Sequence, residues 1–522
     1  MEAWPRWHYA PITPIRPRFM RLRTGSAARL LDQLSRAGRL MLRPGRTSQR
    51  ERASRVKPGS SYSLAPRFPT TVVFVLVSSV MLSWVALYNH APLVFSDTIA
   101  YATAPLRGVL PGFVSPYYGL LILPLHQGIT LWPVVFAQGA ILGHLLYLVI
   151  RCVSDGSIEN LHKILVVIAG LSLFSSLPWL TGEILPDVFT PVVLLGIFLQ
   201  AFCTDQLKYG ERCYIALLTT IGIAVHISHV PIAVGLIVLV LVLQRKFAPA
   251  QVRLSRLAIL VLPLVIAVGS MLSVNWYNSR VLSLSKNGNV FLLAKWADEG
   301  PALSYLEQSC PTVKYELCAY LGDMRGLTHD DLKWGEDSPF TKVGSSFDEL
   351  EPEARRIVWE TLKTYPVKIL YRSLKHAGRQ ILRFQTGDGL TPGYARLVSP
   401  TLGEVFSPAV ERSILESKQG QGRLPIAEFR FLHTVGVIIG LVLCLWSFIA
   451  WRGALPTRLI ALQIFVLAGI VLNAIATGAL SGPYDRYLAR VIWLILFVGL
   501  VSVCCITRIH RDKQVFKRLS AR

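Results

Sequence analysis

Four short polar stretches interrupt the apolar runs of this 522-residue chain, and their side chains are of the kinds that move protons and bind phosphate. A carboxylate at the edge of an apolar bundle is costly to desolvate, so it usually has a task or a partner. The stretches contain Asp97 and Tyr101, then Glu183 and Asp187, then His226 and His229, and finally Asp485, Arg486, Tyr487 and Arg490. If they meet in space, they form an acid–base site with positive charge for an anion.

The acidic residues also have structural interpretations. Asp97 follows Ser96 and precedes a helix-like TIAYATA stretch, so it could be an N-cap, and this residue alone does not separate a cap from a chemical role. Asp187 follows Pro186 and could cap the next helix. Glu183, four residues earlier, has no such explanation.

The histidine pair and the last stretch are open to two interpretations as well. His226 and His229 are three residues apart, which places both on one helical face as phosphate donors or metal ligands. No HExxH motif accompanies them, and we favour hydrogen bonding to loop backbone or to phosphate over a metal site. Asp485 and Arg486 could form a local ion pair at the lipid–water boundary. The neighbours that could be interface anchors are Tyr484, Tyr487 and Arg490.

The composition places these stretches in a membrane protein. Hydrophobic residues make up 52% of the chain, charged residues 16%, and the mean hydropathy is +0.45, which is more apolar surface than a soluble fold buries. We predict an all-α polytopic membrane protein with about ten spans. They are expected at 70–89, 130–150, 163–180, 187–203, 213–229, 231–244, 256–276, 431–450, 458–480 and 488–507. The run 213–244 contains Pro231 and could be a helical hairpin or one broken helix.

Positive charge indicates the orientation of the spans. The formal net charge is +23, and residues 1–69 hold fifteen Lys and Arg against three acids. We predict that this arm is largely disordered and is no cleavable signal peptide, because the first apolar run is long enough to span. With the N-terminus inside, the inner segments, including the tail at 508–522, hold 31 of the 54 Lys and Arg, whereas the short outer loops hold three. The basic balance therefore reports orientation and not nucleic-acid binding.

This topology places all four polar stretches at the outer face, starting with the large first outer loop, 90–129. It also leaves a long outer segment, 277–430, as an external domain between spans seven and eight. Cys310 and Cys318 are the only cysteines expected outside, and we predict a disulfide between them in an oxidising compartment. Residues 387–423 are rich in Gly, Pro and Ser and are expected to be loop-rich, and they could include a mobile acceptor-binding loop.

An amphipathic helix is predicted at 366–384 of the external segment. Its basic stripe consists of Lys368, Arg372, Lys375, Arg379 and Arg383. The apolar residues predicted on the opposite face are Val367, Leu370, Leu374, Ala377, Ile381 and Phe384. Such a helix could lie on the outer leaflet and hold a lipid-linked phosphate. It could also be a domain helix with its basic face in water, the interpretation that we favour.

Together these features resemble the GT-C superfamily of integral-membrane glycosyltransferases. The resemblance lies in a large first outer loop with an acid near a tyrosine, further acids in the next outer loop, and an Arg-Tyr pair that opens the last span. The residues concerned are Asp97, Tyr101, Glu183, Asp187, Arg486 and Tyr487. In that superfamily about seven spans form a shared module, here 70–276. An external domain or variable spans follow, here 277–430 and 431–507.

The resemblance implies inverting transfer of a sugar from a polyprenyl-phosphate donor, with Asp97 as the base, at the periplasmic face of a bacterial inner membrane. The residues expected to orient the acceptor or sugar are Tyr101, Glu183, Asp187 and Asp485. Those expected to bind the donor phosphate are Arg486, Tyr487, Arg490, His226, His229, Lys368, Arg372, Lys375 and Arg379. No cofactor beyond the donor is implied, and whether a divalent cation takes part stays open.

Two further classes are compatible with the sequence. A transporter or flippase for a lipid-linked glycan is the main rival, but polar residues gathered at one face favour an enzyme, because alternating access needs charged groups near the midplane or on both sides. A polysaccharide polymerase or ligase would use similar lipid-linked donors. No nucleotide-binding motif is present. The expected partners are membrane lipid, a polyprenyl-phosphate-linked sugar and a glycan or lipid acceptor, and not nucleic acid.

Overall fold

The computed structural model describes residues 68–154, 160–247, 254–344, 346–451 and 453–520. The chain divides into two compact units, residues 1–64 and 65–522, and all described residues belong to the second. The basic arm predicted at 1–69 therefore lies almost wholly outside the described residues. Within them every element is a helix, apart from a single β-bridge between Leu93 and Glu183. The predicted all-α class is confirmed for this part of the chain.

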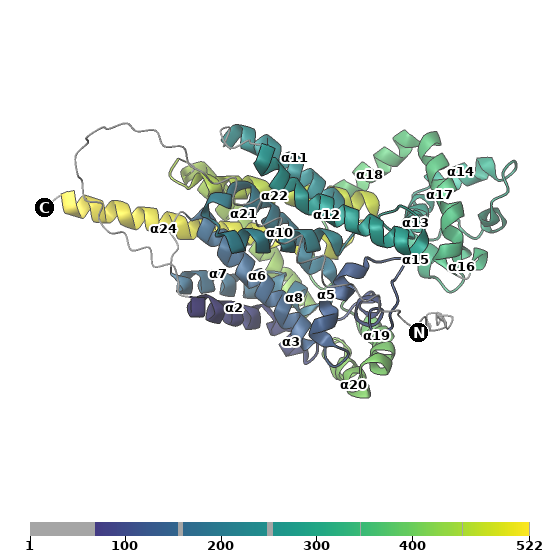
Figure 1. The fold of residues 1–522 in the computed structure, drawn as a ribbon, viewed down its shortest axis with the longest axis horizontal. Coiled ribbons are helices and arrows are strands. Elements are labelled where there is room, and N and C mark those ends of the chain that lie inside the picture. Colours follow the sequence, from purple (N-terminus) through teal and green to yellow (C-terminus); the bar gives the residue numbers. More distant parts are fainter. Residues whose placement is uncertain (1–67, 155–159, 248–253, 345, 452, 521–522) are drawn as a thin grey trace, which may run out of the picture. The chain divides into compact units, whose positions relative to one another are not determined.

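The first half of the described chain forms the helices that carry the first three polar stretches (Figure 1). They are α2 (Phe68–Leu82), α3 (Trp84–Asn89), α4 (Thr98–Thr103), α5 (Pro116–His126), α6 (Trp132–Val153), α7 (Leu161–Phe174), α8 (Leu177–Gly182), η1 (Pro186–Val188), α9 (Phe189–Phe202), η2 (Thr204–Gln206), α10 (Tyr209–Ala224), α11 (His229–Phe247) and α12 (Leu254–Ser279). The run that contains Pro231 forms two helices, α10 and α11, which pack on each other and on α9. It is therefore a hairpin and not one broken helix.

The second half begins with short helices and ends with long ones (Figure 1). They are α13 (Gly288–Asp298), α14 (Pro301–Ser309), η4 (Glu316–Tyr320), α15 (His329–Trp334), α16 (Pro339–Val343), α17 (Phe347–Thr364), α18 (Pro366–Ile381), α19 (Pro392–Val405), α20 (Pro408–Glu416), α21 (Ile426–Trp451), α22 (Thr457–Leu480), α23 (Asp485–Ile492) and α24 (Leu494–Ser520).

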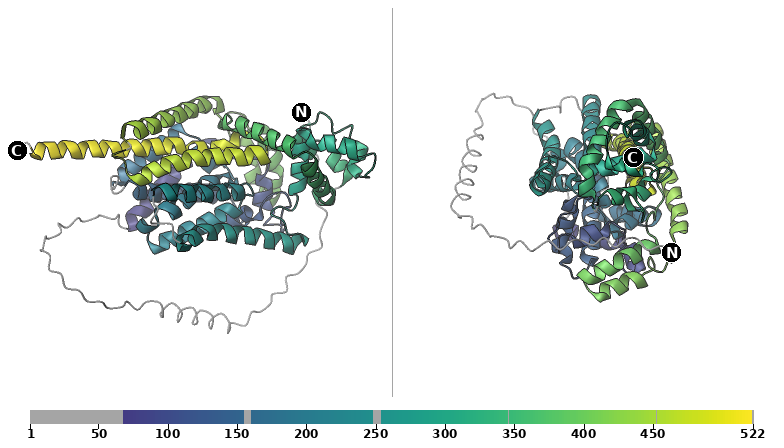
Figure 2. Two further views of the ribbon diagram at one scale, coloured as in Figure 1. Left: turned by 90° about the horizontal axis from the view of Figure 1, so that it is seen from above. Right: turned by 90° about the vertical axis from the view of Figure 1, so that its right-hand side faces the viewer.

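Five helical stretches in the described ranges are long and apolar enough to cross a membrane. They are α6, residues Leu257–Ser279 of α12, α21, α22 and the stretch Asp485–Arg511. Shorter apolar helices lie at Thr70–Leu82, Leu161–Phe174, Pro186–Phe202 and His229–Arg245. The long helices run in roughly the same direction (Figure 2), and α13 to α17 lie at the end of this bundle away from the C-terminal end of α24 (Figure 1). The arrangement is that of a polytopic membrane protein.

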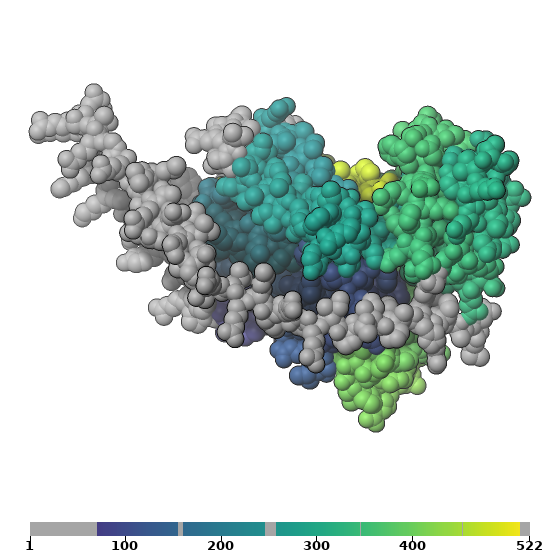
Figure 3. All heavy atoms as spheres, turned by 45° about the vertical axis from the view of Figure 1, so that its right-hand side comes forward, coloured from purple at the N-terminus to yellow at the C-terminus, as the bar shows by residue number. Residues whose placement is uncertain are grey.

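Residues of the outer segment take part in more than one hydrophobic core. The first core runs through the helical bundle and includes Ala395, Val398 and Leu402 of α19. The second core belongs to residues 290–369, from Val290 to Ile369, whose teal and green atoms lie together in Figure 3. The segment predicted as one external domain thus has two parts. Residues 290–369 have a core of their own, and the later residues pack on the helical bundle.

The expectation that residues 387–423 are loop-rich is wrong for much of their length, because they form α19 and α20. Each helix begins with a proline at its first position, and the residue before that proline caps the helix. Thr391 accepts a hydrogen bond from the Tyr394 amide, and Ser407 accepts one from the Val410 amide. Pro392, Ser407 and Pro408, which contributed to the expectation of a loop, are therefore helix-start signals.

The disulfide predicted in the outer segment is confirmed. Cys310 and Cys318 are bonded, with 5.6 Å between their Cα atoms. The bridge closes the loop between α14 and η4, next to the second core, which Cys310 contacts.

Candidate functional site

The chain that leads into Asp97 is fixed from two sides by hydrogen bonds. Leu93 pairs with residues 182–184. Its amide donates to the Gly182 carbonyl at 2.9 Å, and its carbonyl accepts from the Ile184 amide at 3.0 Å. The Gln419 side chain accepts from the Val94 amide at 3.0 Å and donates to the Val94 carbonyl at 2.7 Å. These bonds bring the first and second polar stretches together, and a segment far along the chain holds them in place.

Asp97 lies at the N-cap position of α4, but its side chain does not cap the helix. One carboxylate oxygen accepts a hydrogen bond from Ser96 Oγ at 3.3 Å, and the other lies 3.9 Å from Arg486 Nη1. Its side chain is 31% exposed. Burial raises the pKa of Asp97 above its ordinary value, and the charge of Arg486 opposes that rise. Of its two sequence interpretations, the cap is therefore not realised.

The guanidinium of Arg486 lies over two aromatic rings. Its guanidinium carbon lies 4.4 Å from the centre of the Phe95 ring and 5.0 Å from that of Tyr487. Nη2 also donates to the Tyr487 hydroxyl at 3.3 Å, and the Arg486 amide donates to Asp388 Oδ2 at 3.1 Å. Cation–π contacts of this kind fix the position of the guanidinium. Gly389 has a φ of 79° and lies so close to Phe95 that a side chain there would overlap the ring.

Glu183 contributes a second carboxylate to this group. Among the described residues, no donor lies within hydrogen-bonding distance of its side chain, while its carbonyl accepts from Gln138 Nε2 at 3.0 Å. Burial, reinforced by the charge of Asp187, raises the pKa of Glu183 to about 8. This shift favours the neutral carboxyl group, which is a hydrogen-bond donor.

Asp187 and Arg490 form an ion pair inside the bundle. Arg490 Nη1 lies 2.5 Å from Asp187 Oδ1, and the two side chains are 0% and 7% exposed, respectively. The guanidinium also donates to Asn473 Oδ1 at 2.9 Å and to Ser228 Oγ at 3.3 Å. Both charges are thus satisfied by protein groups. The geometry gives this buried pair a structural role.

The two histidines lie in the turn between α10 and α11 and at the first residue of α11. His229 is fully buried, and its ring nitrogens bond Thr190 Oγ1 at 2.8 Å and the Gly222 carbonyl at 2.5 Å. His226 Nδ1 bonds Ser228 Oγ at 2.8 Å. His229 therefore ties three helical segments together, and in this arrangement neither of its nitrogens is free for phosphate.

The residues around Tyr484 join the outer segment to the last polar stretch. The Tyr484 hydroxyl donates to Asp330 Oδ2 at 2.6 Å and lies 2.7 Å from His329 Nε2. Lys333 Nζ pairs with Asp330 Oδ1 at 3.0 Å, and its charge also lowers the pKa of Asp97. Burial and the hydrogen bond to Asp330 raise the pKa of Tyr484. These contacts join α15 to the last polar stretch.

The remaining predicted residues lie at different distances from this group. Tyr101 is buried on α4, where burial and the nearby Asp97 raise its pKa well above the ordinary value. Asp485 accepts a hydrogen bond from the Gln385 amide at 2.9 Å, and its predicted ion pair with Arg486 is not among the contacts of the described residues. Lys368, on α18, donates to Ser304 of the second core's segment at 3.0 Å.

Sequence reasoning missed four polar residues that surround Asp97 and Arg486. Their charges or hydroxyls act on the site, and they are Asp330, Lys333, Asp388 and Tyr394. All four come from the long outer segment, in which acids and bases balance, so no charge asymmetry marks them. Asp388 had a usable signal, because a lone acid between Gly387 and Gly389 is typical of a tight turn that presents its side chain.

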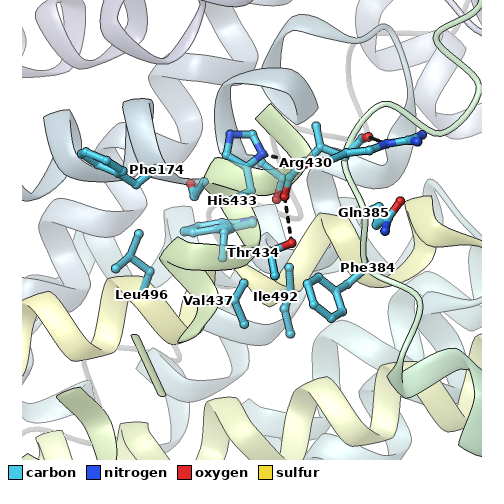
Figure 4. Close-up of a pocket in the computed structure, with 13 residues that line it drawn as sticks. Phe174, Phe384, Gln385, Arg430, His433, Thr434, Val437, Ile492 and Leu496 are labelled. Atoms are coloured by element: carbon cyan, nitrogen blue, oxygen red, sulfur yellow. Dashed lines mark hydrogen bonds between the residues drawn. The ribbon is translucent and has the colours of Figure 1, made fainter. Parts of the chain in front are cut away.

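An apolar groove and a small cavity lie near ends of the long helices. An apolar groove of about 570 Å³ lies between Leu110, after α4, and the end of α12, where Trp276 and Tyr277 line it. The other cavity, drawn in Figure 4, lies beside Arg430 and His433 of α21 and measures about 10 Å³, room for one water molecule. Only the groove has the size for a ligand.

No group of three His, Cys, Asp or Glu side chains suited to a metal ion occurs in the ranges that the structure covers. Comparison with protein-family models, with curated proteins and with solved structures finds no match for this chain.

Proposed function

We propose that the protein is a membrane glycosyltransferase that uses a polyprenyl-phosphate-linked sugar. The observation that carries the proposal is the meeting of Asp97, Glu183 and Arg486, which come from three distant stretches of the chain. A proton acceptor, a neutral carboxyl donor and a fixed guanidinium are the groups that a single displacement at a sugar phosphate needs.

In the proposed reaction Asp97 accepts the proton of an acceptor hydroxyl. The hydroxyl oxygen forms a bond to the anomeric carbon, and the bond from that carbon to the phosphate oxygen breaks with inversion. The polyprenyl phosphate leaves with the electron pair, and Arg486, 3.9 Å from Asp97, stabilises its negative charge. Glu183, whose raised pKa favours the neutral carboxyl group, donates a hydrogen bond that orients the sugar or the acceptor.

The apolar groove supports a lipid-linked donor. Leu110, in the loop after α4, and Trp276, at the end of α12, line it. The same loop continues to Phe113, whose ring lies 5.8 Å from that of Trp334. Lys333, the residue before Trp334, lowers the pKa of Asp97 through its charge. An isoprenoid chain in the groove would reach the surrounding lipid, while its phosphate points toward the polar residues.

For the membrane topology we propose the ten spans and the cytoplasmic termini that the charge pattern predicts. In that topology Asp97, Glu183 and Arg486 lie at the periplasmic face. The helix α2 with α3, and α7 with α8, would each cross the membrane as a broken span.

The test is a transfer assay with purified protein and a panel of radiolabelled polyprenyl-phosphate sugars. We expect wild type to transfer sugar from at least one donor, and Asp97→Asn to lose about 10²- to 10⁴-fold in rate while it still binds that donor. The matched control is Glu404→Gln, an exposed carboxylate on α19 that pairs with Arg107 and should not change the rate. If wild type moves no sugar, and lipid-linked glycan crosses proteoliposomes that contain the protein, a transporter replaces the enzyme.

A further inference from the structure

Helix α18 has three faces, where an ordinary amphipathic helix has two. One face packs on the protein, through the buried residues Ile369, Ala377 and Gln380. Gln380 forms two hydrogen bonds with the Tyr484 backbone, at 2.8 and 3.0 Å. This face attaches α18 to the rest of the protein. The basic stripe predicted from the sequence does not take part in it, and neither does most of the predicted apolar stripe.

The second face of α18 is apolar and exposed. Its side chains are three, four or seven residues apart, so successive turns place them on the same side of the helix. They are Val367, Leu370, Tyr371, Leu374 and Ile381, with exposures between 42% and 77%. Trp359 and Leu362, on the preceding α17, are exposed as well. A run of large exposed apolar side chains marks a surface that contacts something other than water.

The third face is basic and borders the apolar one. Arg372, Lys375, Arg379 and Arg383 follow each other at helical spacing. None of these four forms an ion pair with a carboxylate of the described residues, whereas Lys368, at the start of the stripe, is bonded to Ser304. The stripe thus offers unneutralised positive charge along the edge of an apolar surface.

Helix α18 packs on α22, one of the helices that are long and apolar enough to cross a membrane. Gly478, near the end of α22, lies against the backbone of His376 and Ala377, closer than any side chain would allow. On the same end of α22, Ile475 and Leu480 are exposed apolar residues of a helix long enough to cross a membrane. The exposed face of α18 therefore lies beside exposed apolar side chains at one end of a helix long enough to cross a membrane.

We infer that α18 lies in the outer leaflet with its apolar face among the acyl chains and its basic stripe on anionic lipid headgroups. An apolar face flanked by lysine and arginine is what a helix in the membrane interface requires, since acyl chains cover the first and headgroup phosphates neutralise the second. The inference concerns a lipid surface, and it does not depend on the proposed transfer reaction.

The first arm of the test identifies what covers the apolar face. A photo-crosslinking benzoylphenylalanine replaces Leu370 or Leu374 in the full chain, which is reconstituted in lipid nanodiscs. We expect adducts with the mass of one lipid from both positions, and none from Val313, an apolar residue of the disulfide loop with 41% exposure. A covalent dimer of the chain, or no adduct at positions 370 and 374, overturns the inference.

The second arm tests the charge of the headgroup. In discs that mix phosphatidylglycerol with phosphatidylcholine, we expect the anionic lipid to be enriched in the adducts by at least about twofold over its share of the disc. The triple variant Lys375→Gln, Arg379→Gln, Arg383→Gln should lose that enrichment. A control with the same change in charge, Lys314→Gln, Arg356→Gln, Arg412→Gln, should keep it. Equal enrichment in both triple variants would show that the stripe does not bind the headgroups.

Discussion

Arg486 lies with its guanidinium 3.9 Å from the carboxylate of Asp97, although the two residues come from opposite ends of the described chain. The contact is loose for an ion pair, and neither group is fully buried, since their side chains are 22% and 31% exposed. A phosphate could therefore approach Arg486 without first breaking a tight hydrogen bond. The relationship differs from the closed pair of Arg490 and Asp187 behind it.

The substitution Arg486→Lys tests whether a fixed guanidinium is needed. Lysine keeps the positive charge but loses the planar guanidinium that lies over Phe95 and Tyr487. We expect the rate of sugar transfer to fall by about 100-fold, as when one preorganised donor is lost. Transfer rates of the purified variant, measured at saturating donor, check this.

Arg107→Lys provides the control for that substitution. Arg107 lies in the outer loop after α4 and pairs with the exposed Glu404 at 3.1 Å. We expect it to keep the wild-type rate. A normal rate in Arg486→Lys as well would remove Arg486 from the proposed chemistry.

The buried pair makes a separate prediction about stability. Arg490→Met leaves Asp187 in the bundle without its partner, and an unpaired buried charge costs about 3–5 kcal/mol. Thermal unfolding in detergent should show this loss. The double variant Arg490→Met, Asp187→Leu removes both charges and should recover much of the stability.

An exposed pair sets the scale for that loss. Arg107→Met breaks the contact with Glu404 and should change the free energy of unfolding by no more than about 1 kcal/mol. If Arg490→Met is as mild as Arg107→Met, the pair does not hold the bundle together.

The sequence predicted the helical class and the grouping of polar residues at one end of the helices. Long apolar runs almost always form helices. The distribution of Lys and Arg between loops then predicts which loops lie on the same side of the membrane. Asp97, Glu183 and Arg486 could be nominated in this way. Their roles could not be separated from those of Arg490 and His229, because burial depends on which side of a helix each residue faces after packing.

The faces of α18 show a second limit of sequence reasoning. Periodicity divides the helix into a basic and an apolar side, and an apolar side normally points into a core. In the structure Ala377 is buried but Leu370 and Leu374 are exposed, because α18 approaches α22 through its smallest residues. Contacts between Gly478 and Ala377 are set by tertiary packing, which local spacing does not encode.

The pH dependence of stability should report the unusual carboxyl group of Glu183. Its pKa rises from 4.5 to about 8 in the folded protein, so between these values the folded state binds a proton that the unfolded state has released. The contribution of this group to stability is therefore full below pH 4.5 and is lost as the pH rises through 8. Glu183→Gln carries no titrating proton there.

The measurement compares the melting temperatures of wild type and Glu183→Gln across that pH range. We expect the difference between them to move against wild type as the pH rises, with most of the change complete above pH 8. A difference that stays constant with pH would mean that Glu183 is ionised in the folded protein, and it would take away its proposed role as a donor.

Gly389 offers the last prediction, because it connects backbone conformation with the orientation of Arg486. Its φ of 79° favours glycine, and a Cβ would overlap the Phe95 ring over which Arg486 lies. Gly389→Ala should therefore displace Phe95 and lower the transfer rate. Gly300→Ala separates the two causes, since Gly300 has a φ of 98° but open space around it. We expect both variants to lose about 1 kcal/mol or more of stability from backbone strain, and only Gly389→Ala to lose activity. Equal activity in the two variants would indicate that Arg486 does not rely on Phe95 for its position.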